Sequence, residues 1–399
     1  MTAVPTADSA DRSASANRPQ SHLATPSGLK RARALGVPFA GTPGTNNAIT
    51  DVPGVEVGYE TLISGEGPLR LGQGPVRTGV TAILPRGRKG VGYPCAAGFH
   101  ALNGNGEMTG MAWLEENGSI DLPLLITNTH AVGPCHRGTI DWVVQNRPDL
   151  AAEWLLPVVA ETWDGYLNDI NGPHIQPSHA IAAINRAAGG AIEEGSVGGG
   201  TGMNCYAFKG GNGTASRRVS HGPHDYTVGA FVQANFGSRN ELSIAGVKLG
   251  ELLADDNSIE DHFKPGPSGA GSVIVLIATD APLLPGQCKA LARRVPMGLA
   301  RTGTSSSHFS GDLCLAFSTG NEGSFARGFP KTEPDAASYE QLRFIPWPYI
   351  DPFYEAAVQA VEEAVVNALV ANKTMIGRDG HRSPALPHDR LMAALAARG

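Results

Sequence analysis

The chain has 399 residues, of which 41% are hydrophobic, so it is long enough to bury a large core. Its net charge of −6, with no block of Lys and Arg, argues against nucleic acid or an anionic membrane surface as a partner. No stretch approaches the ~18 apolar residues that a membrane helix needs, and 51 glycines and 29 prolines predict a loop-rich globular protein.

The composition divides the chain into a tail and one large domain. The first 20 residues are rich in Ala, Ser, Thr, Pro and Asp and lack the apolar segment of a secretory signal. We predict a disordered tail over residues 1–30 and a single catalytic domain over residues 31–399. The five cysteines are scattered and odd in number, which argues against a disulfide framework and predicts a reducing, cytoplasmic setting.

Short β-like segments open the domain. Residues 54–59 alternate between apolar and polar positions, and residues 78–85 end at a proline. Three turn-rich segments follow, at residues 100–107, 113–118 and 124–130. They are either ordinary turns that use Asn and Gly for positive φ, or parts of a pocket wall fed by short strands.

Acidic and aromatic side chains cluster at residues 161–169, where three carboxyl groups and two rings occur within nine residues. The cluster is either a ligand wall, offering carboxylates to a cationic group and rings to an apolar one, or a helix-to-loop junction with solvated acids. Ser178 then resembles the N-cap of a small-residue helix over residues 180–188, which ends at Gly189 and Gly190.

The glycine-rich segment Val197–Met203 invites comparison with a phosphate-binding loop, because successive backbone amides can hold an anion. It lacks the Gly-Lys-Ser/Thr ending and the G-x-G-x-x-G pattern of such loops. A tight turn or a close backbone approach is the favoured interpretation.

Two predicted strands deliver polar groups to their ends. Residues 226–237 form a strand that carries Asn235 near its end, and residues 271–280 form a short, wholly apolar and therefore buried strand. Ser272 is either simply the first residue of that strand or the nucleophile of a self-cleaving Gly271–Ser272 bond. Glycine suits the position before such a bond because it has no Cβ to obstruct attack.

The C-terminal third is predicted to contain two helices around one more strand. The first helix runs from Pro282 through Arg294, and the strand over residues 313–317 follows Ser310 and Asp312 directly. The second helix begins near Asp351, as N-cap, with Pro352 at the first helical position. Its buried stripe is predicted to comprise Phe353, Ala357, Val361, Val365 and Leu369.

The polar residues at these strand ends form a set suited to acyl transfer. Ser272 is the candidate nucleophile and Asn235 the candidate oxyanion donor, with Ser310 and Asp312 as a hydrogen-bonded pair. Cleavage before Ser272 would free an α-amine with a pKa of about 8, which can act as the base. No G-x-S-x-G, H-E-x-x-H or C-x-x-C motif is present, so we expect no catalytic metal and no cofactor.

Several long motifs, taken together, resemble the L-aminopeptidase D-amidase/D-esterase family, the DmpA-like β-aminopeptidases. The resemblance runs from about Arg31 to about Arg390, in the family's order. Its motifs are Pro38–Gly44, Asn47–Gly54, Asn103–Met108, Asp164–Asp169, Val197–Met203, and Gly271–Ser272 with Ala278–Leu283.

The resemblance implies a fold, a processing event and an assembly. The fold is an α/β/β/α sandwich, shared with ornithine acetyltransferases and similar to that of N-terminal-nucleophile (Ntn) hydrolases. The precursor is cut after Gly271 into an α chain, residues 1–271, and a β chain, residues 272–399, and the αβ units form tetramers. Such enzymes remove N-terminal residues of L-α, D-α or β type from peptides, amides and esters.

The resemblance also implies roles for individual residues. Ser272 is the nucleophile, Asn235 contributes to the oxyanion hole, and Tyr166 is an active-site hydroxyl. Ser310 and Asp312 are the supporting pair, and some relatives carry the longer Glu at the last position. An aminopeptidase also binds the substrate ammonium, and we expect Glu161 or Asp164 to do this beside a wall formed by Trp163.

Two alternatives remain at this point. An acyltransferase of the ornithine acetyltransferase type shares the fold, but such enzymes use a threonine nucleophile, whereas this chain has Ser272. A non-enzymatic protein could instead bind a phosphate ligand at Gly198–Gly202 and would stay a single uncut chain.

Overall fold

Two β-sheets form the centre of the molecule in a computed structural model, which describes residues 19–264, 269, 271–326, 328–329, 333–335 and 338–397. Strands β1 (Glu56–Ser64), β2 (Val76–Leu84), β5 (Leu124–Asn128) and β6 (Val158–Thr162) make a four-stranded sheet in that order. The second sheet has six strands in the order β4-β3-β14-β13-β10-β9. Their bounds are β3 Cys95–Gly104, β4 Ser119–Ile120, β9 Gly211–His221, β10 His224–Asn235, β13 Gly271–Thr279 and β14 Ser310–Ser318.

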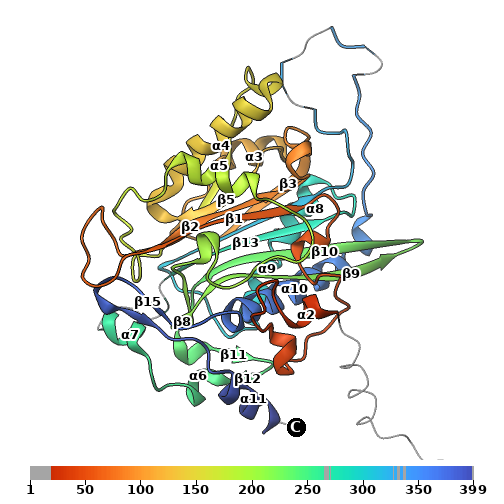
Figure 1. Ribbon diagram of the computed structural model, residues 1–399. Coiled ribbons are helices and arrows are strands. Elements are labelled where there is room, and N and C mark those ends of the chain that lie inside the picture. The colour runs from red at the N-terminus through yellow and green to blue at the C-terminus, as the bar shows by residue number, and fades with distance from the viewer. Residues whose placement is uncertain are drawn as a thin grey trace, which may run out of the picture.

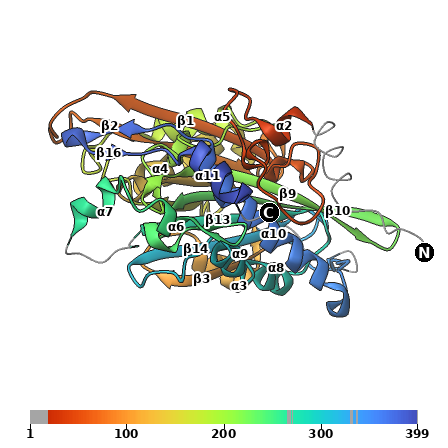
Figure 2. The same ribbon diagram turned by 90° about the horizontal axis from the view of Figure 1, so that it is seen from below.

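Helices cover the outer face of each sheet (Figure 1). Helices α4 (Val132–Asn146) and α5 (Pro177–Asn185) pack on the four-stranded sheet. Helices α8 (Pro285–Ala292) and α10 (Asp351–Val370) pack on the six-stranded sheet, and α9 (Val295–Ala300) packs against α10. Seen from below, α9 and α10 lie along the six-stranded sheet (Figure 2). The predicted four-layer α/β/β/α sandwich is confirmed.

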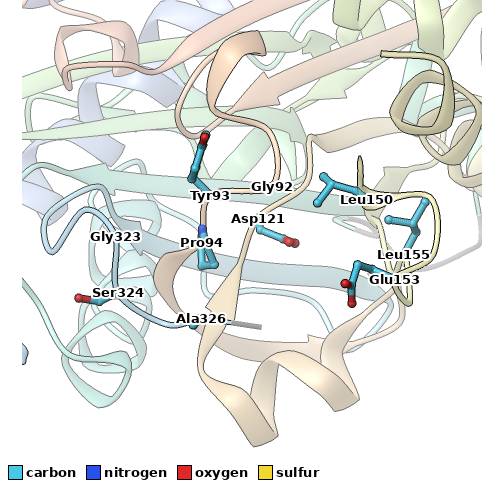
Figure 3. A pocket seen from close by; sticks show the side chains of 10 residues that line it. All are labelled: Gly92, Tyr93, Pro94, Asp121, Leu150, Glu153, Leu155, Gly323, Ser324 and Ala326. Atoms are coloured by element: carbon cyan, nitrogen blue, oxygen red, sulfur yellow. The ribbon is translucent and has the colours of Figure 1, made fainter. Parts of the chain in front are cut away.

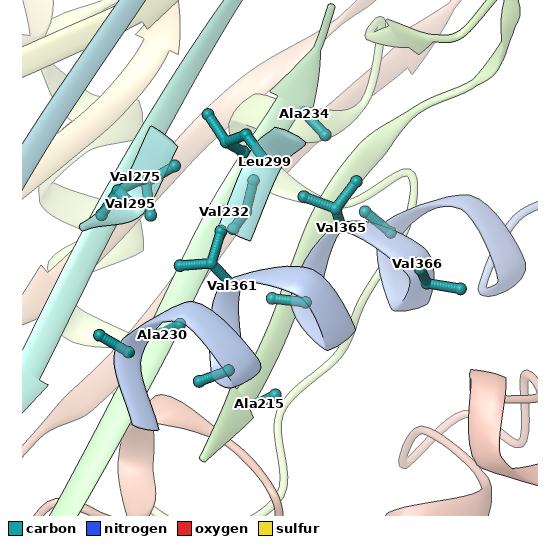
Figure 4. Close-up of a cluster of buried hydrophobic side chains, with 14 of the residues drawn as sticks. Ala215, Ala230, Val232, Ala234, Val275, Val295, Leu299, Val361, Val365 and Val366 are labelled. Atoms are coloured by element: carbon teal, nitrogen blue, oxygen red, sulfur yellow. The ribbon is translucent and has the colours of Figure 1, made fainter. Parts of the chain in front are cut away.

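Side-chain alternation along the strands separates three apolar layers. In β13, Ile274 and Leu276 face the other sheet, whereas Val273 and Val275 face the helices. Figure 4 shows the apolar layer between the six-stranded sheet and its helices, where valines of α10 meet small residues of β9 and β10. A strand that is apolar on both faces can only lie between two covering layers, which explains the continuous apolar run in its sequence.

Smaller elements surround this core. They are the helices α2 (Gln20–Leu23), α3 (Met111–Asn117), α6 (Leu249–Leu252), α7 (Ser258–Phe263) and α11 (His388–Ala396), and the short strands β7 (Asn204–Cys205), β8 (Phe208–Lys209), β11 (Ser243–Ile244), β12 (Val247–Lys248), β15 (Met375–Ile376) and β16 (Arg382–Ser383). None of the helices in the described part of the chain has the length and apolar character needed to cross a bilayer.

The predicted strands agree with the structure better than the predicted helix ends do. Helix α5 begins at Pro177 with Gln176 as its N-cap, so Ser178 lies inside it, and the helix ends at Asn185 rather than at the glycine pair. Helix α8 begins at Pro285, three residues after the predicted start, because Pro282–Leu284 still forms part of the turn that follows β13. In α10, Ile350 is the N-cap and Asp351 is already helical.

The ordered domain also begins before residue 31. Residues 1–18 lie outside the described residues, but Gln20–Leu23 forms helix α2 and His22 is buried with its ring nitrogen 2.8 Å from the Gly44 carbonyl oxygen. Arg31 then forms a buried ion pair of 2.6 Å with Glu194. These contacts attach the end of the predicted tail to the domain. The prediction of disorder was based on local composition, which does not show contacts with residues distant in the sequence.

Candidate active site

Ser272 lies at the start of β13, where the two sheets meet. It is only 3% exposed, and its Oγ accepts a hydrogen bond of 3.2 Å from the backbone N–H of Trp163. The antiparallel register places Asn235 of β10 directly opposite it, and the Asn235 Nδ2 donates to the same Oγ at 3.4 Å. Two N–H donors therefore converge on the hydroxyl that the sequence predicted as the nucleophile.

Neighbouring backbone groups fix the orientation of the Asn235 amide. Its Nδ2 also donates to the Trp163 carbonyl oxygen at 2.9 Å, and its Oδ1 accepts from the backbone N–H of Asn204 at 2.9 Å. The amide is only 5% exposed and cannot rotate without breaking these bonds. Such a preplaced donor is suited to stabilise an oxyanion.

A cavity of about 800 Å³ opens beside Ser272. Five aromatic residues contribute to its lining: Trp163, Tyr166, Phe236, Phe263 and Phe309. Asn105 and Thr129 also line it, which confirms that the turn-rich segments at residues 100–107 and 124–130 contribute to a pocket wall. The volume suits a small ligand with several apolar groups.

Glu161 provides a carboxyl group to this cavity. Its side chain is 3% exposed, its Oε1 accepts from the Glu107 backbone N–H at 2.8 Å, and its Oε2 accepts from the Thr129 hydroxyl. Burial raises the pKa of this carboxyl, while the Thr129 and Glu107 donors oppose the rise. A carboxylate held in this way can accept a cationic group that enters the cavity.

Tyr166 and Trp163 line the cavity with their rings. The Tyr166 hydroxyl lies 3.3 Å from the Arg382 carbonyl oxygen and 3.4 Å from that of Ser258, and burial raises its pKa. The Tyr166 ring stacks on His381, and its position in the cavity wall matches the predicted site. No hydrogen bond joins its hydroxyl to Ser272 among the described residues. Trp163 is 38% exposed, as expected for a residue that lines an open cavity.

Asp164 lies outside the cavity, and the prediction that it contacts substrate is not supported by its position. The side chain is 0% exposed and its Oδ1 accepts from Asn168 Nδ2 at 3.0 Å. Burial raises the pKa of this carboxyl to about 7. Because successive residues leave β6 with alternating directions, Trp163 faces the cavity and Asp164 faces the interior.

Ser310 and Asp312 lie on β14, the parallel neighbour of β13, at the positions beside Gly271 and Val273. The Ser310 hydroxyl donates to Asp312 Oδ1 at 2.5 Å, which confirms that they form a hydrogen-bonded pair. Asp312 also accepts from Ser306 and Asn103, and burial raises its pKa. No hydrogen bond joins either side chain to the Ser272 hydroxyl in the described structure.

The glycine-rich segment is a packing element. Gly198–Gly200 forms a buried 3₁₀ turn between the sheets, and the amides of Gly198 and Gly199 donate to the hydroxyls of Thr61 and Thr81 at 2.8 and 3.1 Å. The amides of Gly200 and Thr201 donate to backbone carbonyls. Since these four amides already have partners, the phosphate-binding alternative is wrong and the tight-turn interpretation is confirmed.

A smaller cavity of about 290 Å³ lies elsewhere, as Figure 3 shows. Its polar side chains are those of Tyr93, Asp121, Glu153 and Ser324, and it shares no lining residue with the Ser272 cavity. None of the predicted catalytic residues contributes to it. The cavity beside Ser272 is therefore the candidate active site.

Comparison with known proteins agrees with this geometry. The profile of peptidase family S58 matches residues 47–383, most of the chain. The chain belongs to peptidase family S58. It is therefore a hydrolase that acts on peptide bonds.

Similar S58 peptidases include proteins of known activity. The chain is 49% identical over 373 residues to the beta-peptidyl aminopeptidase BapA of Sphingosinicella microcystinivorans, covering 92% of this chain and 91% of that protein. The L-aminopeptidase D-Ala-esterase/amidase of Ochrobactrum anthropi, a variant of the Ntn hydrolase fold, is 44% identical with a TM-score of 0.85, covering 92% and 99%. The beta-aminopeptidase of a Burkholderia species is 45% identical with a TM-score of 0.81, with the same coverage.

Sequence reasoning missed the residues that hold Asn235 in place. Asn204 and Lys209 belong to the short β7–β8 hairpin, whose strands are two residues each and leave no periodic signal. The backbone of Trp163 was also missed, because any residue provides an N–H and a C=O. The turn residues Tyr206 and Ala207 did not indicate a hairpin either, since neither residue type is typical of a hairpin turn.

Proposed function

We propose that this protein cuts itself between Gly271 and Ser272 and then acts as a serine aminopeptidase. One observation carries the proposal: the Ser272 hydroxyl accepts hydrogen bonds from Trp163 and Asn235, at the first residues of a buried strand that borders a large cavity. A family S58 peptidase needs a nucleophile at such a place, and Ser272 is the one serine among the described residues that line the cavity.

Self-cleavage follows from the position of Gly271. The Ser272 hydroxyl attacks the Gly271 carbonyl carbon, the C–N bond breaks, and an ester replaces the amide. Water then hydrolyses the ester and leaves a carboxylate on Gly271 and a free α-amine on Ser272. A Cβ on residue 271 would lie 2.0 Å from the Asn235 carbonyl oxygen, so glycine is needed at this point of the sheet.

The free α-amine supplies the base for substrate hydrolysis. Its ordinary pKa of about 8 leaves part of it unprotonated near neutral pH. It takes the proton of the Ser272 hydroxyl, whose oxygen attacks the substrate carbonyl carbon. The substrate C–N bond then breaks, the leaving amine takes that proton, and an acyl-enzyme ester remains on Ser272. Water hydrolyses the ester, which releases the amino acid and restores the hydroxyl. Asn235 and the Trp163 amide stabilise the oxyanion, and Ser310 and Asp312 support the amine from the neighbouring strand.

Glu161 is the proposed partner of the substrate ammonium. It is the carboxyl on the same short segment as Trp163 that faces the cavity, whereas Asp164 does not. The Trp163 ring forms the adjacent wall, and Tyr166 closes another side. A free N-terminus on the substrate is therefore required, which distinguishes an aminopeptidase from an endopeptidase.

The names of the relatives favour β-amino acids, or L- and D-amino acids, at the substrate N-terminus. The cavity of about 800 Å³ holds a short peptide, an amide or an ester. We further propose a cytoplasmic enzyme, in keeping with five buried cysteines that form no disulfide, and a tetramer of αβ units, as the family resemblance implies.

The test is hydrolysis of p-nitroanilides of β-homoalanine, L-alanine and D-alanine, each compared with its N-acetylated form. The free-amine form of at least one should be cleaved and every acetylated form should resist. Glu161→Gln should raise KM for the cleaved substrate by about tenfold, whereas Asp164→Asn should leave KM within about twofold. Equal cleavage of free and acetylated substrates would overturn the aminopeptidase assignment.

A further inference from the structure

The Asn235 amide is connected to a buried lysine through one peptide group. The Met203–Asn204 peptide donates its N–H to Asn235 Oδ1 at 2.9 Å, and its carbonyl oxygen accepts from the Lys209 ammonium at 2.7 Å. Lys209 Nζ also donates to the Gly210 carbonyl oxygen at 2.9 Å. A chain of hydrogen bonds thus runs from the buried Lys209 side chain to the donor that faces Ser272.

Lys209 is an unusual residue to find in this position. It is 0% exposed, although long cationic side chains are almost never fully buried without a reason. Burial lowers its pKa to about 7, while the Asp164 carboxylate acts in the opposite direction. Asp164 is equally buried and adjoins Trp163, whose carbonyl accepts the second bond of the Asn235 amide.

The hairpin that carries Lys209 is held in a strained form. Strands β7 and β8 pair Asn204 with Lys209, and the two turn residues, Tyr206 and Ala207, both have positive φ, at 53° and 55°. Glycine, Asn or Asp usually occupies such positions. Here the Arg239 guanidinium holds the turn by donating to the carbonyls of both residues. Strain of this kind persists where surrounding structure overdetermines it, often near functional sites.

We infer that Lys209 is a positioning residue that orients and polarises the Asn235 amide toward the oxyanion formed at Ser272. The ammonium draws electron density from the Met203–Asn204 peptide, which strengthens the N–H bond to Asn235 Oδ1. Hydrogen bonds in series polarise one another in a low-dielectric interior, so the Asn235 Nδ2–H becomes a stronger donor. The effect is felt mainly in the transition state, when the substrate oxygen gains charge.

The inference rests on the proposed role of Ser272, and Lys209→Met tests it. Methionine keeps the length and apolar stem of the side chain. The variant leaves no buried carbonyl without a donor, because Met203 O also accepts from the Gly210 amide and Gly210 O from Asn372. The variant should show kcat about tenfold below wild type with KM within about twofold.

A double-mutant cycle with Asn235→Ala separates this role from general packing. If Lys209 acts through Asn235, adding Lys209→Met to Asn235→Ala should lower kcat by less than about twofold further. The rate constant of self-cleavage provides a second readout for the same cycle, because this reaction involves no substrate binding and therefore no KM. If Lys209→Met alone does not fold, the charge-neutral pair Lys209→Met/Asp164→Asn carries the cycle.

Three results would overturn the inference. The first is a wild-type kcat in a folded Lys209→Met variant. The second is a tenfold loss of kcat that persists in the Asn235→Ala background. The third is a loss of kcat accompanied by a comparable rise in KM and a lower melting temperature. Wild type and Ser272→Ala are measured beside these variants. A wild-type chain that neither cuts itself nor hydrolyses substrate would refute the proposed function as well, which distinguishes the two failures.

Discussion

Gly271→Ala should slow self-cleavage through a steric conflict that can be located in the sheet. The added Cβ would lie 2.0 Å from the Asn235 carbonyl oxygen and 3.1 Å from both its carbon and the Phe236 Cα. An ordinary carbon–oxygen contact is about 3.3 Å, so β13 would have to move from β10 by about 1 Å. Overpacking of this kind costs about 1–3 kcal/mol of stability.

The larger effect should be on the reaction. A displacement of about 1 Å moves the scissile carbonyl relative to the Ser272 hydroxyl, and such misplacement lowers reaction rates by about 10²-fold. The fraction of cut chain is followed against time on denaturing gels, with the masses of the two fragments measured. Gly104→Ala is the matched control, because this glycine lies on β3 of the same sheet, paired with β14, and an added Cβ meets nothing within 4 Å. Cleavage of Gly271→Ala at the wild-type rate would refute the steric argument.

Three further predictions concern oxyanion stabilisation, packing and acid stability. Asn235→Ala should lower kcat by about 10²- to 10³-fold with little change in KM; steady-state kinetics showing a loss below fivefold would contradict this. Gly199→Ala would place a Cβ 2.4 and 2.6 Å from neighbouring oxygens, and should lower the free energy of unfolding by about 1–3 kcal/mol in urea titrations; wild-type stability would count against it. Burial alone would raise the pKa of Glu363, but Arg217 and Arg33 lower it to about 2. The carboxylate therefore contributes about 3 kcal/mol to the free energy of unfolding above pH 4.5, and this contribution is lost as pH falls toward 2. Glu363→Gln should flatten the acid dependence of the melting temperature, and an unchanged dependence would contradict this prediction.

The sequence predicted the parts of the fold that have a clear pattern. The apolar run of β13, the strand ending at Asn235 and the periodic stripe of α10 all lie where apolar residues must be buried on one or both faces. Helix starts were less accurate at α5, which begins at Pro177 before the predicted cap Ser178, and at α8, which begins at Pro285 rather than at Pro282. Local composition also placed the start of the ordered domain too late.

The site was predictable where side-chain chemistry is diagnostic and unpredictable where geometry decides. Ser272, Asn235 and Glu161 converge on the cavity as expected, whereas Asp164, close to Glu161 in sequence, points into the interior. Which of two nearby acids faces a cavity depends on the direction in which the chain leaves β6, and composition does not reveal this. Lys209 acquires its position from a hairpin too short to leave a sequence signal.

The measurement that tests the central claim most directly is the intact mass of the purified protein under denaturing conditions, beside Ser272→Ala. We predict two chains for the wild type, the smaller beginning with Ser272, and one uncut chain for the variant. A single 399-residue wild-type chain that still hydrolyses amino-acid amides would contradict the account, because no free α-amine would then exist on Ser272 to serve as the base.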